Sequence, residues 1–248
     1  MSALKIIVAY DKNSRDYRSY FPEYDPEGEI YVPVMGGHAL GNIPEQYAEM
    51  QGDDDGEDNI SNLNPYIYEI SQLYWAWKNL DKLDNPDFIG LNHFRRLYTA
   101  NTWNQGGVLT PDTIVSPTRC GFGVPNVDAM GEARFNPSLK QITLDLIDTL
   151  YPNRSTEEQQ MHDDFMAHDY LPTSNLFIMP TTKLDDFMAK VMQAIDQLQP
   201  VIADSGDGKT YPICAAAKIL EFVDGYYFAR MMNLEGFRCV QPHILLFS

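Results

Sequence analysis

Short apolar runs, each ended by polar or turn-forming residues, are the clearest pattern along this chain. The run over residues 5–10 is rich in β-branched side chains and stops at the polar turn that begins with Asp11. Similar runs cover residues 30–34, 88–91, 174–179 and 238–240. Continuous apolar runs of this length predict buried strands. Pro33 moves the second strand toward an edge of the sheet.

Helical periodicity separates several of these runs. Asn64 and Pro65 combine an N-cap with proline at the first helical position, and residues 65–80 then predict one continuous helix. Ser155 and Glu158 form a capping box that predicts another helix start. Further helices are expected over residues 136–150, 184–198 and 213–233.

The alternation of strands and helices predicts an α/β fold with a mostly parallel sheet flanked by helices. We expect a single domain over residues 1–248. Residues 99–135, rich in Gly, Pro, Thr and Asn, are expected to form an irregular loop that is functional or mobile.

The charge balance narrows the choice of partners. The chain has 35 acidic and 18 basic residues and a net charge of −17, which argues against nucleic acid and anionic lipid. No apolar run approaches the length of a membrane helix, and the start of the chain lacks a signal-peptide pattern. Cys120, Cys214 and Cys239 are widely spaced and form no CxxC pair, which favours reduced thiols. We therefore expect a cytoplasmic protein with at most peripheral membrane contact.

A cationic stretch follows directly on the strand at residues 88–91. Ligands of open α/β sheets bind at the carboxyl ends of the strands, where His93, Arg95 and Arg96 stand. In an extended chain, His93 and Arg95 would share one side, with Phe94 and Arg96 on the other. Arginine matches phosphate oxygens with its planar fork, so a small polyanion such as a diphosphate fits this stretch. The alternative, equally open from residue types, is that the arginines pair with carboxylates and His93 belongs to the core.

Three features within residues 58–98 carry a family resemblance. They are Asp58-Asn59-Ile60-Ser61, Glu69 ahead of YWAWKN at residues 74–79, and GLNHFRR at residues 90–96. This segment resembles a family of bacterial capsular and exopolysaccharide biosynthesis proteins, long catalogued as a domain of unknown function, for which glycosyltransferase activity is proposed. The resemblance continues at residues 170–179 and 225–233, so it extends over most of the chain.

The resemblance implies transfer of a sugar from a nucleotide-diphosphate donor, with UDP as the expected nucleotide. Galactose and galactofuranose are among the sugars it suggests. The implied acceptor is a lipid-linked or oligosaccharide unit of a growing polysaccharide.

A weaker similarity is to glycosyltransferases of the GT-A type. Their first strand ends at the nucleotide base, and a later Asp-x-Asp holds a metal against the donor diphosphate. Here His93-Phe94-Arg95 occupies the Asp-x-Asp position, and cationic side chains neutralise a diphosphate directly. The similarity therefore implies a metal-independent enzyme without a cofactor, with Mn²⁺ or Mg²⁺ as the open alternative.

The same two resemblances imply a set of donor-binding residues. By the GT-A analogy Asp11 would bind the base or ribose and Tyr10 would stack, although an ordinary turn after the strand is equally open. Glu69 takes a site role from the family match, with a solvated glutamate as its alternative. The full set is Tyr10, Asp11, Lys12, His38, Glu69, His93, Arg95, Arg96 and Asn175. The acidic segment Asp53-Asp54-Asp55 lacks the spacing of a calcium loop and is expected to be a solvated turn.

The resemblance does not assign the catalytic base to one residue of this chain. Inverting transfer needs a carboxylate to take the acceptor proton, and family members resemble G-[FY]-L-x-E-R near the C-terminus. Here Ala229 stands at the glutamate position, which leaves Asp224 and Glu221 as the nearest carboxylates, with Asp224 preferred beside Gly225. Ala229 also keeps open a rival function, a non-catalytic nucleotide- or sugar-binding regulatory protein of the same pathway.

Overall fold

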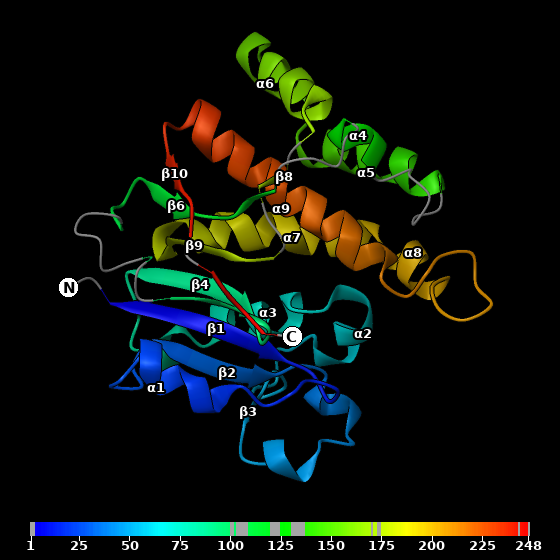
Figure 1. The fold of residues 1–248 in the computed structure, drawn as a ribbon. Helices are drawn as coiled ribbons and strands as arrows, with labels where there is room; N and C mark the ends of the chain where they lie inside the picture. Colours follow the sequence, from blue (N-terminus) through cyan, green and yellow to red (C-terminus); the bar gives the residue numbers. More distant parts are fainter. Residues whose placement is uncertain are drawn as a thin grey trace. The chain divides into compact units, whose positions relative to one another are not determined.

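The computed structural model describes residues 3–99, 102, 109–119, 125–129, 137–169, 171–172, 175–242 and 244–247. The chain forms two compact units (Figure 1), and each is described by itself. The first unit comprises Met1–Ser116, Asn175–Asp185 and Cys239–Ser248, and the second comprises Pro117–Ser174 and Asp186–Arg238. The expectation of one domain over residues 1–248 stays a prediction, and Cys120 lies outside the described residues.

A mixed sheet forms the centre of the first unit, apart from Arg238 at the start of one strand. Its path runs β10-β6-β9-β4-β1-β2-β3, and β5 pairs with both β4 and β11. The strands are β1 (Leu4–Tyr10), β2 (Tyr31–Met35), β3 (Gln51–Gly52), β4 (Phe88–His93), β5 (Arg96–Tyr98), β6 (Thr113–Val115), β9 (Phe177–Pro180), β10 (Arg238–Val240) and β11 (Ile244–Leu246). The α/β class is confirmed, and the parallel part of the sheet is β4-β1-β2-β3, which ends at the edge strand β3.

Strands β1 and β4 are parallel neighbours, with Ala9 opposite His93 in the register. Asp11, just after β1, and His93, at the end of β4, therefore lie at the same edge of the sheet. Strand β2 lies on the other side of β1, and β3 pairs only with Val34 and Met35. Pro33, which has no N–H to donate, thus lies just before the short contact with the edge strand.

Beyond β4 the sheet becomes antiparallel, because β9 runs opposite to β4. Gly90 in β4 faces this neighbour closely: a Cβ atom there would lie 2.9 Å from the carbonyl oxygen of Phe177. Any larger side chain would push the two backbones apart. The glycine of the GLNHFRR stretch therefore has a packing role.

The core around the sheet gathers apolar side chains from strands distant in sequence. Ile6, Val8, Phe88 and Ile178 are buried in it together with Tyr10. Burial of such area is the main favourable term in folding. Burial on both faces of the sheet explains why these strands are continuously apolar and do not alternate between apolar and polar residues.

The helix expected over residues 65–80 is interrupted in the structure. Helix α2 (Asn64–Ile67) ends at Tyr68, which has φ 50° and ψ −126°, and α3 (Ile70–Lys78) begins after Glu69. The Asn64 side chain donates to the carbonyl oxygen of Tyr68 at 3.0 Å and so holds the break. The continuous helix was wrong because hydrogen bonds between side chains and backbone replaced the helical ladder here.

The second unit is built mainly of helices. They are α4 (Asn126–Ala129), α5 (Ser138–Leu150), α6 (Thr156–Ala167), α7 (Leu184–Gln197), α8 (Gln199–Ala203) and α9 (Ala215–Leu234), with α7 beginning in the first unit. The capping box predicted at α6 is present, since Ser155 and Glu158 bond reciprocally. Helix α9 packs against α5, α6 and α8, with Phe165 edge-on to Phe222 and Phe187 stacked on Phe228.

The loop expected over residues 99–135 is only partly described. It includes β6 and α4, and β7 (Thr118–Arg119) pairs with β8 (Leu171–Pro172). The expectation of a wholly irregular segment was therefore wrong for these parts, and much of the rest lies outside the described residues. No helix in the described part of the chain has the length and apolarity needed to span a membrane.

The first unit carries short helical elements besides α2 and α3. Helix α1 spans Phe21–Tyr24 and has Pro22 in its first turn. Helix α3 packs against β1. The nine residues of α3 bury nearly all of their side chains, including Leu73 and Trp75. Its side chains bond to residues at the ends of the strands: Gln72 donates to the carbonyl oxygen of Tyr10, and Ser71 donates to Asp53.

Candidate functional site

A tight hairpin carries the cationic stretch. Strand β4 ends at His93, Phe94 and Arg95 form the turn, and β5 begins at Arg96, which is the register partner of His93. Opposed residues of an antiparallel pair point to the same face, so His93 shares a face with Arg96. The expectation that His93 and Arg95 share a side assumed an extended chain, and the turn at Phe94 and Arg95 removes that premise.

The imidazole of His93 is held neutral. Burial, together with the guanidinium groups of Arg95 and Arg96, lowers the pKa of His93 to about 4. A carboxylate oxygen of Glu69 lies 3.8 Å from Nε2, a distance too long for a hydrogen bond to offset these effects. Nδ1 accepts the backbone N–H of Arg95 at 3.2 Å, which also requires that this nitrogen be unprotonated. His93 therefore adds no positive charge to this edge of the sheet at neutral pH.

Arg95 presents its guanidinium at the tip of the hairpin. Its side chain is exposed and lies 5.4 Å from the centre of the Phe94 ring. Within the described residues, this guanidinium forms no ion pair with a carboxylate. Arg96 is half-buried and has interactions of its own. Of the two arginines, Arg95 is therefore the one placed to meet an anion.

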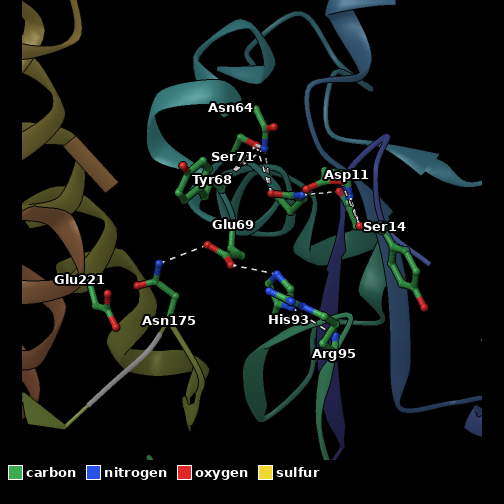
Figure 2. A network of polar contacts seen from close by, with 12 residues as sticks. Asp11, Ser14, Asn64, Tyr68, Glu69, Ser71, His93, Arg95, Asn175 and Glu221 are labelled. Atoms are coloured by element: carbon green, nitrogen blue, oxygen red, sulfur yellow. Dashed lines mark hydrogen bonds and ion pairs between the residues drawn. The ribbon is translucent and has the colours of Figure 1, made fainter. Parts of the chain in front are cut away.

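Glu69 and Asn175 form the next part of the site, close to His93. The amide nitrogen of Asn175 donates to Glu69 at 3.3 Å, and Figure 2 shows Glu69 between Asn175 and His93. Asn175 is 6% exposed and has φ 53°, a left-handed conformation just before β9. The alternative of a solvated glutamate is excluded, since the Glu69 side chain is only 16% exposed. The structure thus brings together Glu69, His93 and Asn175 from three distant segments.

The other motif residues hold α3 in place. Asp58 accepts from Tyr74 at 2.6 Å and pairs with Lys78 at 2.9 Å. The Lys78 ammonium also lies 4.2 Å from the centre of the Trp77 ring. The Trp77 indole donates to Asp185 at 2.6 Å. The acidic residue, tyrosine, tryptophan and lysine of the motif therefore stabilise the helix that follows Glu69.

A buried carboxylate from the acidic segment accepts hydrogen bonds from the loop after β2 and from two serine hydroxyls. Asp53 has no solvent exposure and accepts the backbone N–H groups of Gly37 and His38, each at 3.0 Å. The hydroxyl of Ser71 donates to it at 2.6 Å, and the hydroxyl of Ser61 also donates to it. The solvated turn expected here was wrong for Asp53. The pairing of Asp53 with Ser61 of the DNIS motif would have been visible only in three dimensions.

The neighbouring acidic residues remain nearer the surface. Asp54 pairs with the half-buried His38 ring at 2.8 Å, and Asp55 pairs with Lys82. The loop before His38 is packed tightly, because a Cβ on Gly36 would lie 2.1 Å from the side-chain nitrogen of Gln72. His38 is thus fixed by its backbone and its ring at the end of β2.

The residues after β1 divide into a buried and an exposed group. The Tyr10 ring is 1% exposed and packs 5.7 Å from the rings of Tyr47 and Phe94, so it could stack on a base only by leaving the core. Its carbonyl oxygen accepts from Gln72 at 2.9 Å.

Asp11 and Lys12 are exposed at the edge of the sheet. Asp11 caps its own turn by accepting the N–H of Asn13 at 2.7 Å. The hydroxyl of Ser14 donates to the same carboxylate oxygen of Asp11, at 3.2 Å. Lys12 therefore adds a solvated positive charge beside a turn that is already organised.

The two catalytic candidates lie on α9 in the second unit. Glu221 is 8% exposed and pairs with Lys218 at 2.8 Å, whereas Asp224 is fully buried. Ala229, at the expected glutamate position, is buried on the same helix. The roles of Glu221 and Asp224 stay predictions, as do those of the donor-binding residues in the first unit.

Among the described residues, no cluster of three or more His, Cys, Asp or Glu side chains has a geometry suited to a metal ion. Asp53, the most buried carboxylate of the acidic segment, is already surrounded by four protein donors. The hydrogens of these N–H and O–H groups point at the carboxylate, so they favour its negative charge and would repel a cation at the same place.

The fold has a counterpart among solved structures. The chain superimposes with a TM-score of 0.70 on the apo structure of WbbM, a bifunctional glycosyltransferase, at 18% sequence identity. The match covers 99% of this chain and 45% of the WbbM chain, so this chain spans less than half of that protein. At this identity the likeness concerns the fold.

Sequence comparison identifies the family. No curated protein matches the chain. A family profile with the description "Domain of unknown function (DUF4422)" matches residues 18–211, well over half of the sequence. The matched range contains the hairpin at His93, the Glu69 region and the buried Asp53. The chain therefore belongs to the DUF4422 family.

Proposed function

We propose that this protein is a glycosyltransferase that uses a nucleotide-diphosphate sugar, with UDP as the nucleotide. The observation that carries the proposal is the position of Arg95. Its exposed guanidinium stands at the carboxyl edge of β1 and β4, where ligands of parallel sheets bind. The likeness of the fold to a bifunctional glycosyltransferase supports the same conclusion.

The electrostatics of this edge suit a diphosphate leaving group. In transfer, an acceptor hydroxyl attacks the anomeric carbon, the bond to the diphosphate oxygen breaks, and the nucleoside diphosphate leaves with added negative charge. A fixed cation placed where that charge develops stabilises the transition state. Arg95 supplies this charge, and neutral His93 supplies a polar neighbour that does not compete with it.

The acceptor proton needs a base, and Asp224 and Glu221 are the proposed candidates. A carboxylate oxygen of Glu221 lies 2.8 Å from the Lys218 ammonium. A carboxylate can accept the proton of the attacking hydroxyl. The acceptor is proposed to be a lipid-linked or oligosaccharide unit of a growing polysaccharide, with membrane contact through partners or at the surface. Galactose and galactofuranose are the proposed sugars.

The first experiment is a binding and turnover measurement on the purified chain. A thermal-shift series with UDP, UDP-galactose and UDP-glucose should stabilise the protein, by about 2.7 kcal/mol at a hundred times the dissociation constant. Release of UDP in the presence of an oligosaccharide acceptor would then establish transfer. Absence of stabilisation by every nucleotide in the series would contradict the proposal.

The rival function is a non-catalytic binder of nucleotides or sugars. It is favoured by one observation, the alanine at position 229 where the resembling family has glutamate. Binding of UDP-sugars without release of UDP, across several acceptors, would support this rival. Turnover that Asp224→Asn or Glu221→Gln abolishes would exclude it.

A further inference from the structure

Glu69 and Asn175 contact each other beside His93, and Tyr68 directly precedes Glu69 in the chain. Three groups of these residues are not used by a diphosphate. They are the exposed ring of Tyr68, the carboxylate of Glu69 and the amide of Asn175. We infer that they form a sugar subsite that binds the transferred hexose of the donor, an inference that rests on the proposed function.

Tyr68 is held in a conformation that side chains rarely adopt. Its φ of 50° with ψ of −126° lies in a region that glycine favours, and its side chain is 37% exposed. Two contacts to its carbonyl oxygen hold this backbone, from the Asn64 amide at 3.0 Å and the Ser71 N–H at 3.2 Å. Strained residues with exposed side chains concentrate at functional sites. An aromatic ring kept at such a cost has a surface available for a ligand.

Asn175 contributes an unused acceptor. Its amide nitrogen donates to Glu69 at 3.3 Å, which fixes the orientation of the amide group. Within the described residues, the buried amide oxygen of Asn175 has no hydrogen-bond partner. A buried acceptor without a partner costs free energy unless a ligand or a water satisfies it. Asn175 itself has a left-handed backbone, the second such residue beside Glu69.

The combination of groups matches the chemistry of a sugar ring. A hexose has hydroxyls that donate and accept, and faces of C–H groups that are apolar. The Glu69 carboxylate accepts from hydroxyls, the Asn175 oxygen accepts from another, and the Tyr68 ring covers an apolar face. A phosphate or a free carboxylate would instead be repelled by Glu69.

The position beside His93 indicates which sugar is bound. The Glu69 carboxylate lies 3.8 Å from His93, and the His93 ring accepts the backbone N–H of Arg95, the proposed diphosphate ligand. The transferred sugar is joined directly to the diphosphate, so it must lie next to the phosphate site. The ribose of the nucleotide is joined to the other end of the diphosphate. The experiment below distinguishes a hexose site from a ribose site.

The test measures binding of UDP, UDP-galactose and UDP-glucose by titration calorimetry to the intact chain and three variants. Glu69→Gln and Tyr68→Ala are expected to weaken the better-binding UDP-hexose about five- to tenfold and UDP less than twofold. Tyr68→Phe keeps the ring and should bind the UDP-hexose as the wild type does. Lys209→Ala, a change of an exposed residue in the second unit, is the control for nonspecific effects of substitution.

The outcomes separate this inference from the proposed function. If UDP itself does not bind, the proposed function has failed and the sugar subsite falls with it. If UDP binds and Glu69→Gln or Tyr68→Ala weakens it as strongly as the UDP-hexose, the subsite is a ribose site and the inference is wrong. Unchanged affinity for the UDP-hexose in both variants, with melting temperatures showing that they are folded, would also overturn it.

Discussion

The Nε2 atom of His93 lies 3.8 Å from a carboxylate oxygen of Glu69, yet the imidazole stays neutral. Burial and the two adjacent arginines outweigh the attraction of the carboxylate and lower the pKa of His93 to about 4. A charged His93 would help to hold a diphosphate and would make activity fall as the pH rises, and the neutral imidazole does neither.

The first prediction concerns stability at acid pH. The pKa of His93 is about 4 in the folded chain, against 6.5 for an exposed histidine, so the unfolded state binds a proton in this window that the folded state does not. The free energy of unfolding should therefore decrease as the pH falls from about 7 to 4, by roughly 3 kcal/mol from this group.

Urea titrations of the wild type and His93→Gln over this range measure the effect. The stability difference between the two proteins should shrink toward low pH, because the variant lacks the titrating group. A difference independent of pH would show that His93 titrates normally. Above about pH 6 the charge of His93 is constant, so no loss of activity between pH 6 and 8 should trace to it.

The second prediction concerns Arg95. Arg95→Ala should weaken binding of UDP by about 1.5 to 3 kcal/mol, the range for hydrogen bonds to charged groups, and leave uridine binding unchanged. Arg95→Lys keeps the charge and should lose less. Calorimetric titration of UDP and uridine checks the prediction, with Lys209→Ala as a charge-matched control. Equal losses for UDP and uridine would indicate a structural role for Arg95.

The third prediction uses the strained backbone of Tyr68. Alanine and glycine both remove the ring, but only glycine relaxes φ 50° with ψ −126°. Tyr68→Gly should therefore be more stable than Tyr68→Ala by about 1 kcal/mol, opposite to the usual order in helical segments. Thermal and urea denaturation of the two variants measure this difference. An alanine variant as stable as the glycine variant would show that the backbone relaxes without the ring.

The fourth prediction concerns the buried Asp53. Asp53→Ala would leave two backbone N–H groups and the hydroxyls of Ser61 and Ser71 without their acceptor. Loss of a buried, multiply bonded carboxylate should lower the free energy of unfolding by about 3 to 5 kcal/mol. Asp55→Ala is the matched control, since Asp55 pairs with Lys82 at the surface and its removal should leave stability unchanged. Similar stability of the two variants would refute the structural role of Asp53.

The fifth prediction is independence from divalent metals. The hairpin supplies Arg95 at the position where GT-A enzymes carry an Asp-x-Asp, so the diphosphate meets a positive charge without a cation. A divalent ion beside Arg95 would meet repulsion of order 1 to 4 kcal/mol, depending on the local dielectric. UDP release should therefore persist in EDTA. If EDTA abolishes turnover and manganese restores it, another group of carboxylates must hold the phosphates.

Much of the fold follows from local patterns in the sequence. The strands at residues 5–10 and 88–91, the capping box at Ser155 and the apolar face of α7 are all present as expected. Each depends on contacts between residues close in sequence, or on the single requirement that an apolar run be buried. The adjacency of β1 and β4 does not follow in this way, because β2 and β3 lie between these two strands in the sequence.

The sequence by itself determined that an acidic chain of α/β type carries a cationic stretch at the end of a strand. Tertiary structure decided what that stretch does. The turn at Phe94 and Arg95 exists because β5 pairs with β4, and that pairing sets which side chains share a face. The break at Tyr68 and the burial of Asp53 depend on Asn64, Ser61 and Ser71, residues brought to these positions by the folded strand ends. Such hydrogen bonds join segments whose spacing in sequence shows no period, and so only the three-dimensional arrangement could reveal them.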